Sequence, residues 1–308
     1  MALLLAGGVL LDLLLGEVRR WHPLVGFGNW AHAIERYTNR GRQRRGRGIA
    51  AWMLAVLPLV CLTAWACGLA GLIAHGLMLY FCIGLRSLRD HNLPIARALQ
   101  NGDLAQARLL TGRIVSRDTG HASAADLAKA SAESLLENGN DAVFGTLFWF
   151  AVAGGPGAVL FRLANTLDAM WGYRTARFND FGWAAARIDD ALNYAPARLT
   201  ALSYIVLAPT AAGKRRAWTC WRTQAPAWSS PNAGPVMASG AGALGLALGG
   251  AATYDGQLEQ RPPLGCGAPA TAHDIVRAWR LVANTTALWL ACVALPAVLL
   301  YVFRSAHA

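Results

Sequence analysis

The sequence has 308 residues, of which 55% are hydrophobic and 15% are charged, and its mean hydropathy is +0.33. Soluble domains carry charge on about a quarter of their residues, so this composition argues against a soluble protein and indicates an integral membrane protein. The formal net charge of +11 comes almost wholly from arginines that flank apolar segments. We expect positive-inside topology and phosphate binding to account for them, and no nucleic-acid partner.

The first apolar run, "MALLLAGGVLLDLLLG", lacks a basic region before it and is interrupted by Asp12, so we expect a retained membrane segment and not a signal peptide. The loop that follows holds Arg19, Arg20 and six more arginines between Arg36 and Arg47. A short loop this basic is typical of the cytoplasmic side. Residues 49–85 then run almost without charge, long enough for two antiparallel spanning helices.

Residues 86–142 predict cytoplasmic helices, with a turn at Asn101-Gly102 and Ser123 as the cap of a helix that continues through Asn138. In the segment "SRDTGH", Arg117 and Asp118 could bind an anion or could cap this helix.

Two acidic residues of this helix, Glu133 and Glu137, stand at i and i+4, with Asp141 just beyond. Like charges at this spacing are unfavourable, and a magnesium ion or a cationic substrate group would offset their repulsion. The alternative is a solvated helix face on which Lys129 compensates Glu133. Spacing alone leaves both alternatives open.

The apolar run from Val143 to Phe161 is broken by "GGPG" at residues 154–157. If it crossed the membrane, the arginines after it would face the wrong side. A re-entrant or deeply buried helix pair removes this conflict, because broken backbone at membrane depth is tolerated inside protein. We therefore expect residues 162–198 on the cytoplasmic side, above an apolar floor.

Residues 162–198 pair carboxylates with amides one helical turn away and surround them with arginines. Oxygen ligands at such spacings suit a hard cation that bridges phosphates, and arginine forks match phosphate geometry. A network of buried ion pairs is the alternative, but two such pairs above an apolar floor favour a site. The residues concerned are Asn165, Asp168, Arg187, Asp189, Asp190, Asn193 and Arg198.

The rest of the chain predicts a short, re-entrant segment at "LTALSYIVLAPTAAG", irregular loops with one short helix of small residues in 224–270, and a last span at about 286–303. The six cysteines form no C-x-x-C pair, so we expect neither disulfides nor a zinc site. The predicted fold class is all-α: a polytopic integral membrane protein with a cytoplasmic helical region and re-entrant or broken helices. We expect one domain, 1–308, with regions 1–85, 86–142, 143–280 and 281–308.

Several segments, in this order, resemble the CobD/CbiB family of cobalamin biosynthesis proteins, the adenosylcobinamide-phosphate synthases. They are "LDLLLGEVRRWHPLVGFGNW", "RSLRDH", "SRDT", "ESLLENGNDAVFGTLFW", "GGPGAVLFRLANTLDAMWGYR", "FGWAAARIDDALNYAPARLTAL" and "SSPNAGPVMASGAGALGLALGG". The resemblance implies an ATP-dependent ligase that joins the propionate carboxyl of adenosylcobyric acid to (R)-1-amino-2-propanol O-phosphate. The chain departs from the common family pattern at Ala227 and Trp228, before the Ser-Pro-Asn element.

With this resemblance, the expected site residues fall into three overlapping sets. Catalytic roles are expected for Glu137, Asp168, Asp189 and Asp190. Magnesium is expected on Glu133, Glu137, Asp141, Asp168 and Asp190. Substrates and phosphates are expected on Arg117, Asp118, Arg162, Asn165, Arg174, Arg187, Asn193, Arg198, Ser230 and Asn232.

The resemblance also implies cofactors, partners and location. We expect ATP and Mg²⁺, a corrinoid substrate, contact with membrane lipid, a complex with other late cobalamin-pathway enzymes as a candidate assembly, and a multi-pass protein of the bacterial inner membrane whose active site faces the cytoplasm. The alternative is a non-catalytic membrane sensor or scaffold, similar to AmpE. A scaffold would not need this density of Asp, Asn and Arg in 162–198.

Overall fold

The computed structural model describes residues 1–18 and 22–306, with side chains described as far as residue 295. Arg19 and Arg20 of the basic loop lie outside the described residues. The packing divides the chain into two compact units. The first unit comprises Met1–Gly84, Asp141–Asn193 and Val293–Ala308, and the second comprises Leu85–Asn140 and Tyr194–Cys292. The sequence predicted one domain of four consecutive regions, whereas each unit is assembled from separated stretches; whether they fold as one domain stays a prediction.

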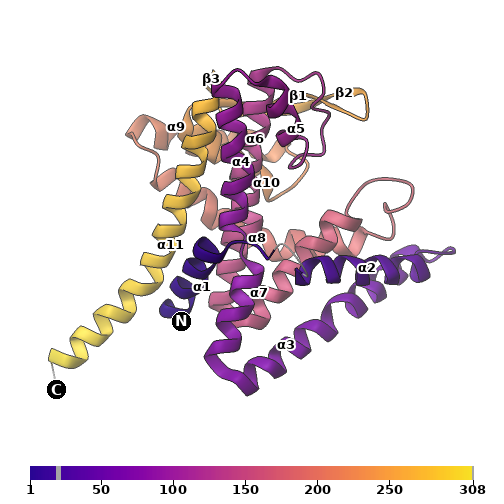
Figure 1. Ribbon diagram of the computed structural model, residues 1–308, viewed down its shortest axis with the longest axis vertical. Coiled ribbons are helices and arrows are strands. Elements are labelled where there is room, and N and C mark those ends of the chain that lie inside the picture. The colour runs from indigo at the N-terminus through magenta and orange to yellow at the C-terminus, as the bar shows by residue number, and fades with distance from the viewer. Residues whose placement is uncertain (19–21, 307–308) are drawn as a thin grey trace. The chain divides into compact units, whose positions relative to one another are not determined.

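The first unit is built around α3 (Arg44–Cys82), which packs against α1 (Ala2–Leu15), α2 (Pro23–Thr38) and α7 (Gly145–Trp171). The start of α8 (Trp183–Val206) and the end of α11 (Ala272–Ala306) also belong to this unit. Figure 1 shows α2 lying along the first part of α3. Helix α2 begins with Pro23 at its first position, after His22, because proline fixes a helical φ and lacks only an N–H that would be unbonded there.

Both long apolar helices of this unit are broken at a glycine with positive φ. Helix α3 breaks at Gly71 (φ 57°), where two helical segments meet at a sharp kink (Figure 1), as expected for two helices in 49–85; that each of them spans a membrane stays a prediction. Helix α7 breaks at Gly154 (φ 64°), which confirms the predicted break. The N–H of Gly155 donates to Nδ1 of His75 at 2.8 Å, so a side chain of α3 satisfies the broken backbone of α7.

In the second unit, α4 (Leu85–Gln100) packs against α5 (Leu104–Thr111) and α6 (Ala124–Gly139). The turn at Asn101-Gly102 is confirmed. Ser123 caps α6 as predicted, through a reciprocal capping box with Asp126. A π-helical turn, η1 (Asn140–Phe144), follows α6.

The remaining helices of the second unit are the later part of α8, α9 (Ala211–Gln224), the 3-10 turn η2 (Ala225–Ala227), α10 (Ala233–Leu244) and most of α11 (Ala272–Ala306). Helix α10 is the predicted small-residue helix, and it packs against α9 and α6. The apolar segment that starts at Leu199 is the end of α8, so it does not begin a separate helix; its re-entrance stays a prediction.

A small sheet occupies the region predicted as irregular loops, so the all-α fold class was wrong in this part. Strand β1 (Leu246–Tyr254) pairs antiparallel with β2 (Gln257–Leu264) and parallel with β3 (Ala268–Pro269), in the order β2-β1-β3. The hairpin turn is Asp255-Gly256, with φ of 48° and 76°. Positive φ at both positions is the type I′ geometry that matches the twist of a hairpin.

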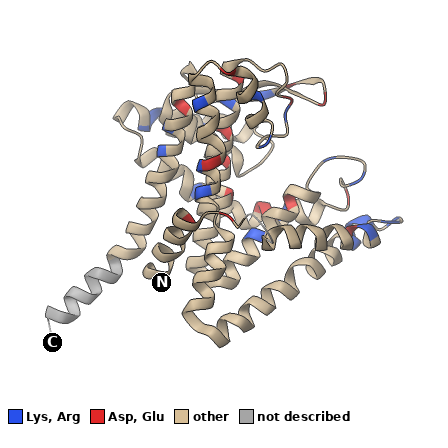
Figure 2. Cartoon of the chain, in the orientation of Figure 1, with Lys and Arg blue, Asp and Glu red and all other residues tan. Residues whose placement is uncertain are grey.

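Within the described residues, three helical runs are long and apolar enough to cross a membrane by length and composition: Arg44–Gln100, Ala124–Trp171 and Ala272–Leu295. In Figure 2 the apolar lengths of α3 and α7 are tan, the colour of residues other than Lys, Arg, Asp and Glu. In the sequence, no Lys, Arg, Asp or Glu occurs between residues 48 and 85 or between residues 142 and 161. The candidate spans therefore confirm that these helices are strongly apolar. How many times the chain crosses a membrane stays a prediction.

Candidate functional site

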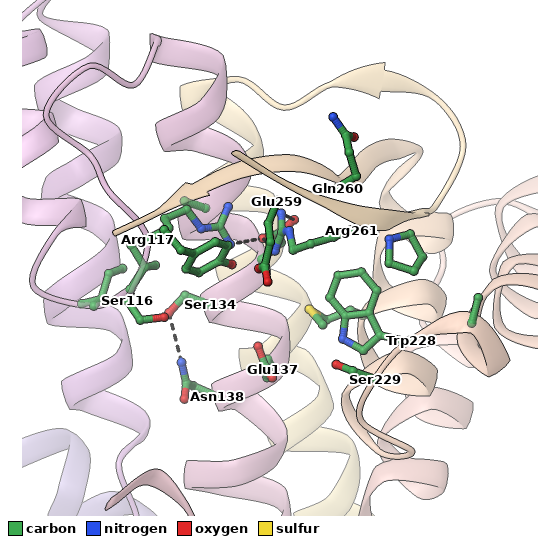
Figure 3. A pocket seen from close by; sticks show the side chains of 18 residues that line it. Ser116, Arg117, Ser134, Glu137, Asn138, Trp228, Ser229, Glu259, Gln260 and Arg261 are labelled. Carbon is green, nitrogen blue, oxygen red and sulfur yellow. Dashed lines mark hydrogen bonds and ion pairs between the residues drawn. The ribbon is translucent and has the colours of Figure 1, made fainter. Parts of the chain in front are cut away.

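A pocket of about 600 Å³ lies in the second unit, walled by α6, the β1–β2 hairpin and the segments before α6 and α10 (Figure 3). Helix α6 contributes Ala130, Glu133, Ser134, Glu137 and Asn138. Spacings of three, four and seven residues put these positions on one face of the helix. The polar side chains from the other walls are Ser116, Arg117, Trp228, Ser229, Glu259, Gln260 and Arg261.

The carboxylate of Glu133 is buried in the wall of this pocket and accepts hydrogen bonds from three residues. Its Oε1 accepts from the backbone N of Gly249 at 2.7 Å and from Nη2 of Arg261 at 3.2 Å. Its Oε2 accepts from Nη1 of Arg261 at 3.1 Å and from Nη2 of Arg117. One carboxylate and two guanidiniums form a group with net charge +1.

These contacts correct both predictions for Glu133. Its two oxygens are occupied by protein donors, so it does not fit a magnesium ligand. It is also not on a solvated face, since it is only 2% exposed, and Lys129 pairs with Asp126 at 3.3 Å instead. Glu137, one turn further on, also lines the pocket (Figure 3).

Arg117 and Asp118 were predicted to bind an anion or to cap α6. Their side chains lie in different places. Arg117 lines the pocket. The Oδ2 of Asp118 accepts from the N of Gly256 at 2.7 Å, and the Asp118 N donates to the O of Thr253 at 2.8 Å. Asp118 therefore fixes the hairpin turn, and the cap of α6 is Ser123.

Two residues of the pocket, Arg261 and Trp228, were missed by the sequence analysis. The guanidinium of Arg261 lies 5.6 Å from the centre of the Trp228 ring, within cation–π range. Arg261 is held by Glu133 on α6, 128 residues away in sequence, so no local pattern marks it. The only signal at Trp228 was its departure from the family pattern.

Three predicted substrate-binding residues come together at the start of α10. The Nη1 of Arg198 donates to Oδ1 of Asn232 at 2.6 Å, and its Nη2 donates to the O of Pro231 at 3.0 Å. The guanidinium stacks 3.6 Å from the ring centre of Tyr194. The Oγ of Ser230 accepts from the backbone N of Asn232 and Ala233, at 3.3 and 3.2 Å. Arg198 thus orders the segment that leads into α10.

The first unit holds a separate group of carboxylates, centred on Asp189 of α8. Asp189 is 8% exposed, and its carboxylate accepts from Nδ2 of Asn193 at 3.2 and 3.1 Å and from Nδ2 of Asn165 at 3.4 Å. Burial, and then the negative charges of Asp141 and Asp168, raise the pKa of Asp189 to about 8. The predicted pairing of Asp189 with Asn193 is confirmed, and Asn165 joins them from α7.

The neighbouring Asp190 is more open. Burial raises its pKa, and the positive charges of Arg187 and Arg174 oppose that rise. The Nη1 of Arg187 lies 3.8 Å from Oδ2 of Asp190. Arg174 and Arg187 are exposed side chains, so both remain accessible to a ligand.

Arg162 of α7 belongs to the same group of charged residues in the first unit, because the charges of Asp141 and Glu17 act on it. Its Nε is buried and has no hydrogen-bond partner among the residues that the structure describes. Buried donors are nearly always satisfied, so this N–H is a donor to which a ligand oxygen could bind.

The predicted site residues therefore form two groups. Asp141, Arg162, Asn165, Asp168, Arg174, Arg187, Asp189, Asp190 and Asn193 belong to the first unit, and Arg117, Asp118, Glu133, Glu137, Arg198, Ser230 and Asn232 belong to the second. Across the described part of the chain, no three His, Cys, Asp or Glu side chains already have the arrangement of a metal site.

Helices of membrane-spanning length and two clusters of carboxylates and arginines define the class: a mostly helical protein with polar sites and three candidate membrane spans. The model of the CobD/Cbib protein family matches residues 5–282, and this chain belongs to that family.

Relatives carry the description cobalamin biosynthesis protein CobD. The relative from Stutzerimonas stutzeri is 57% identical over 289 residues, covering 92% of this chain and 94% of its own. The relative from Chromobacterium violaceum is 55% identical over 300 residues, covering 94% and 95%. A relative from Mycobacterium tuberculosis is 36% identical over 279 residues, covering 88% of each chain. No solved structure matches this chain.

Proposed function

We propose that this protein acts in cobalamin biosynthesis as an adenosylcobinamide-phosphate synthase. In this reaction ATP drives formation of an amide between adenosylcobyric acid and (R)-1-amino-2-propanol O-phosphate. Family membership supports the pathway, and the relatives' shared description supports it as well. The reaction itself follows from the resemblance given above.

The observation that carries the proposal is the polar group of the first unit. It combines a buried arginine N–H, on Arg162, that has no acceptor among the described residues, with carboxylates whose charges oppose the ionisation of Asp189. Anionic phosphate oxygens would satisfy the first feature and a divalent cation the second. A nucleoside triphosphate with its metal ion supplies both.

Asp141, Asp168 and Asp190 would hold magnesium in the proposed enzyme. Their hard oxygen donors suit that ion, and Glu133 is excluded because its oxygens accept from Arg117 and Arg261. When bound, the ion would neutralise phosphate charge and polarise a phosphoryl oxygen. The first unit's Arg162, Arg174 and Arg187 would bind the phosphates.

The chemistry has two steps. The corrinoid carboxylate attacks the γ-phosphorus of ATP, and ADP leaves. The amine nitrogen then attacks the acyl phosphate, the amide C–N bond forms, and phosphate leaves. The amine must lose a proton, and we assign that proton to Glu137, a carboxylate that lines the pocket of the second unit.

We assign the phosphorylated amine to the pocket of the second unit. Arg117 donates to Glu133 through one nitrogen and lines the pocket, so its other N–H groups can donate to phosphate oxygens. Glu137, which also lines the pocket, offers a carboxylate to an ammonium group. The proposed enzyme is multi-pass in the inner membrane, with both sites facing the cytoplasm, in contact with lipid and in a complex with other late enzymes of the pathway.

The test uses the full chain, purified in detergent, with the corrinoid acid, the amine phosphate, ATP and Mg²⁺. We expect amide product and ADP in equal amounts, and no ADP when either organic substrate is omitted. Asp168→Ala and Asp190→Ala should abolish product while leaving membrane insertion intact. Asp180→Asn is the matched control, because Asp180 is an exposed carboxylate of the same unit that pairs with Arg45. Product formation without ATP, or full activity in both alanine variants, would refute the proposal.

A further inference from the structure

Two cysteines of the second unit, 46 residues apart in sequence, lie with their sulfur atoms 3.7 Å apart. Cys220 belongs to α9 and is 2% exposed. Cys266 lies in the loop between β2 and β3 and is exposed. A disulfide needs the sulfurs at about 2.05 Å, so a closure of about 1.7 Å would join α9 to this loop.

A second contact holds the two cysteines opposite each other. Gln224 stands one helical turn after Cys220, on the same face of α9. Its Nε2 donates to the O of Gly265 at 2.9 Å, and its Oε1 accepts from the N of Gly265 at 2.6 Å. This pair of hydrogen bonds fixes the residue beside Cys266, so the approach of the sulfurs is built into the local fold.

The loop that carries Cys266 has a defined path. Gly265 has a φ of 72° and Gly267 a φ of 155°, which other residues rarely adopt. A Cβ on Gly265 would lie 2.2 Å from the O of Leu246. The loop is therefore held tightly on both sides of Cys266.

The two thiols differ in access. Cys266 is open to a dissolved oxidant, whereas burial, and then the hydrogen bond with Cys266, raise the pKa of Cys220 to about 12. The thiolate is the reactive form of cysteine. Cys220 is therefore protected from direct attack and placed to meet an oxidised Cys266.

We propose that Cys220 and Cys266 are a redox-active pair, in which Cys266 reacts with a peroxide and Cys220 resolves it to a disulfide. The sulfur of Cys266 attacks one oxygen of hydrogen peroxide and the O–O bond breaks. The displaced hydroxide takes the thiol proton and leaves as water, and Cys266 becomes a sulfenic acid. The sulfur of Cys220 then attacks that sulfur and the S–S bond forms; the displaced hydroxide takes the Cys220 proton and leaves as a second water. Two thiols and one peroxide give one disulfide and two waters: the sulfurs are oxidised and the peroxide oxygens are reduced.

This site goes beyond the proposed ligation and does not depend on it. The disulfide would join α9 to the segment just after β2, the strand that carries Arg261 of the pocket wall. The sequence analysis predicted no disulfide because the chain has no C-x-x-C motif, and a contact between positions 220 and 266 leaves no such local signal.

The test treats the full chain in detergent with hydrogen peroxide, alkylates the remaining thiols and digests with trypsin. Trypsin cleaves after Arg222, which separates the two cysteines. We expect a peptide pair linked through Cys220 and Cys266 that is two hydrogen masses lighter than its reduced form and is released by dithiothreitol. Cys61 and Cys292, which are also exposed, serve as internal controls and should not enter this linked pair.

The variants separate the two roles. Cys220→Ser should form no link and should accumulate a sulfenic acid at Cys266 that a dimedone probe traps. Cys266→Ser should leave Cys220 reduced under the same treatment. The proposal is overturned if the wild-type chain carries sulfinic acid at Cys266 without the link, or if Cys220→Ser and wild type give the same products.

Discussion

The contacts of Glu133 make a prediction that separates a structural role from a metal-binding one. Glu133→Gln keeps the size of the side chain but removes the charge that faces Arg117 and Arg261. Those side chains are only 12% and 13% exposed, so both guanidiniums would remain buried without their carboxylate. An amide NH₂ group would also replace one acceptor oxygen and point a donor at a guanidinium.

The expected cost is large. Removal of one partner from a buried ion pair costs about 3–5 kcal/mol, a substantial part of the ~5–15 kcal/mol that stabilises a typical protein. For a chain of this size, we expect the thermal midpoint to fall by roughly 6 °C or more. The hairpin should be affected first, because Glu133 also accepts from the N of Gly249 in β1.

The assay is thermal unfolding in detergent, with hydrogen exchange of residues 246–264 as a local measurement. Glu259→Gln is the matched control, since Glu259 lines the same pocket but is exposed; its effect should stay within about 0.5 kcal/mol. The magnesium concentration for half-maximal activity should be unchanged in Glu133→Gln. Equal stability of the two variants, or a higher magnesium requirement with normal stability, would refute the structural role.

The other predictions concern charge, capping and topology. The raised pKa of Asp189 means that the native state binds its proton more tightly than the unfolded state, so stability should fall as pH rises from about 4 to about 8; melting curves of Asp189→Asn should show a shallower fall. Ser123→Ala should lower the free energy of unfolding by about 1 kcal/mol, measured by the same melts. Arg198→Lys should raise the KM for a phosphorylated substrate by about tenfold, equivalent to ~1.4 kcal/mol, whereas Arg44→Lys should have little effect; equal effects would contradict a special role for Arg198. A cysteine at position 179, replacing Asn179, should resist labelling from the periplasmic side of intact cells, and ready labelling would contradict a cytoplasmic 162–198 segment.

Features encoded within a few residues could be predicted from the sequence. The capping box at Ser123 and the spacing of Asp189 and Asn193 depend on residues three or four apart, and both are present. The break in α7 follows from a glycine that is free to adopt positive φ. In each case a signal within a few residues is enough to predict the feature.

Features that depend on distant partners could not be predicted. The sheet was missed because its strands contain Gly249, Gly250, Pro262 and Pro263, which are depleted in strands. The turn at Asp255-Gly256 was the available signal. The role of Glu133 was missed because Arg261, one of the two arginines that donate to its oxygens, is 128 residues away in sequence.

The carboxylates of the two units differ in the groups that surround them, and this difference indicates different roles. Glu133 pairs with two arginines of its own unit in a group of net charge +1, so a cation would gain little there and the residue serves to hold the hairpin against α6. Asp189 is held by the uncharged amides of Asn193 and Asn165 while Asp141 and Asp168 oppose its ionisation. A ligand that brings positive charge would therefore be stabilised in the first unit, because it would offset the repulsion among Asp141, Asp168 and Asp189. The physical case for placing the metal and the nucleotide there, and not on α6, rests on this contrast.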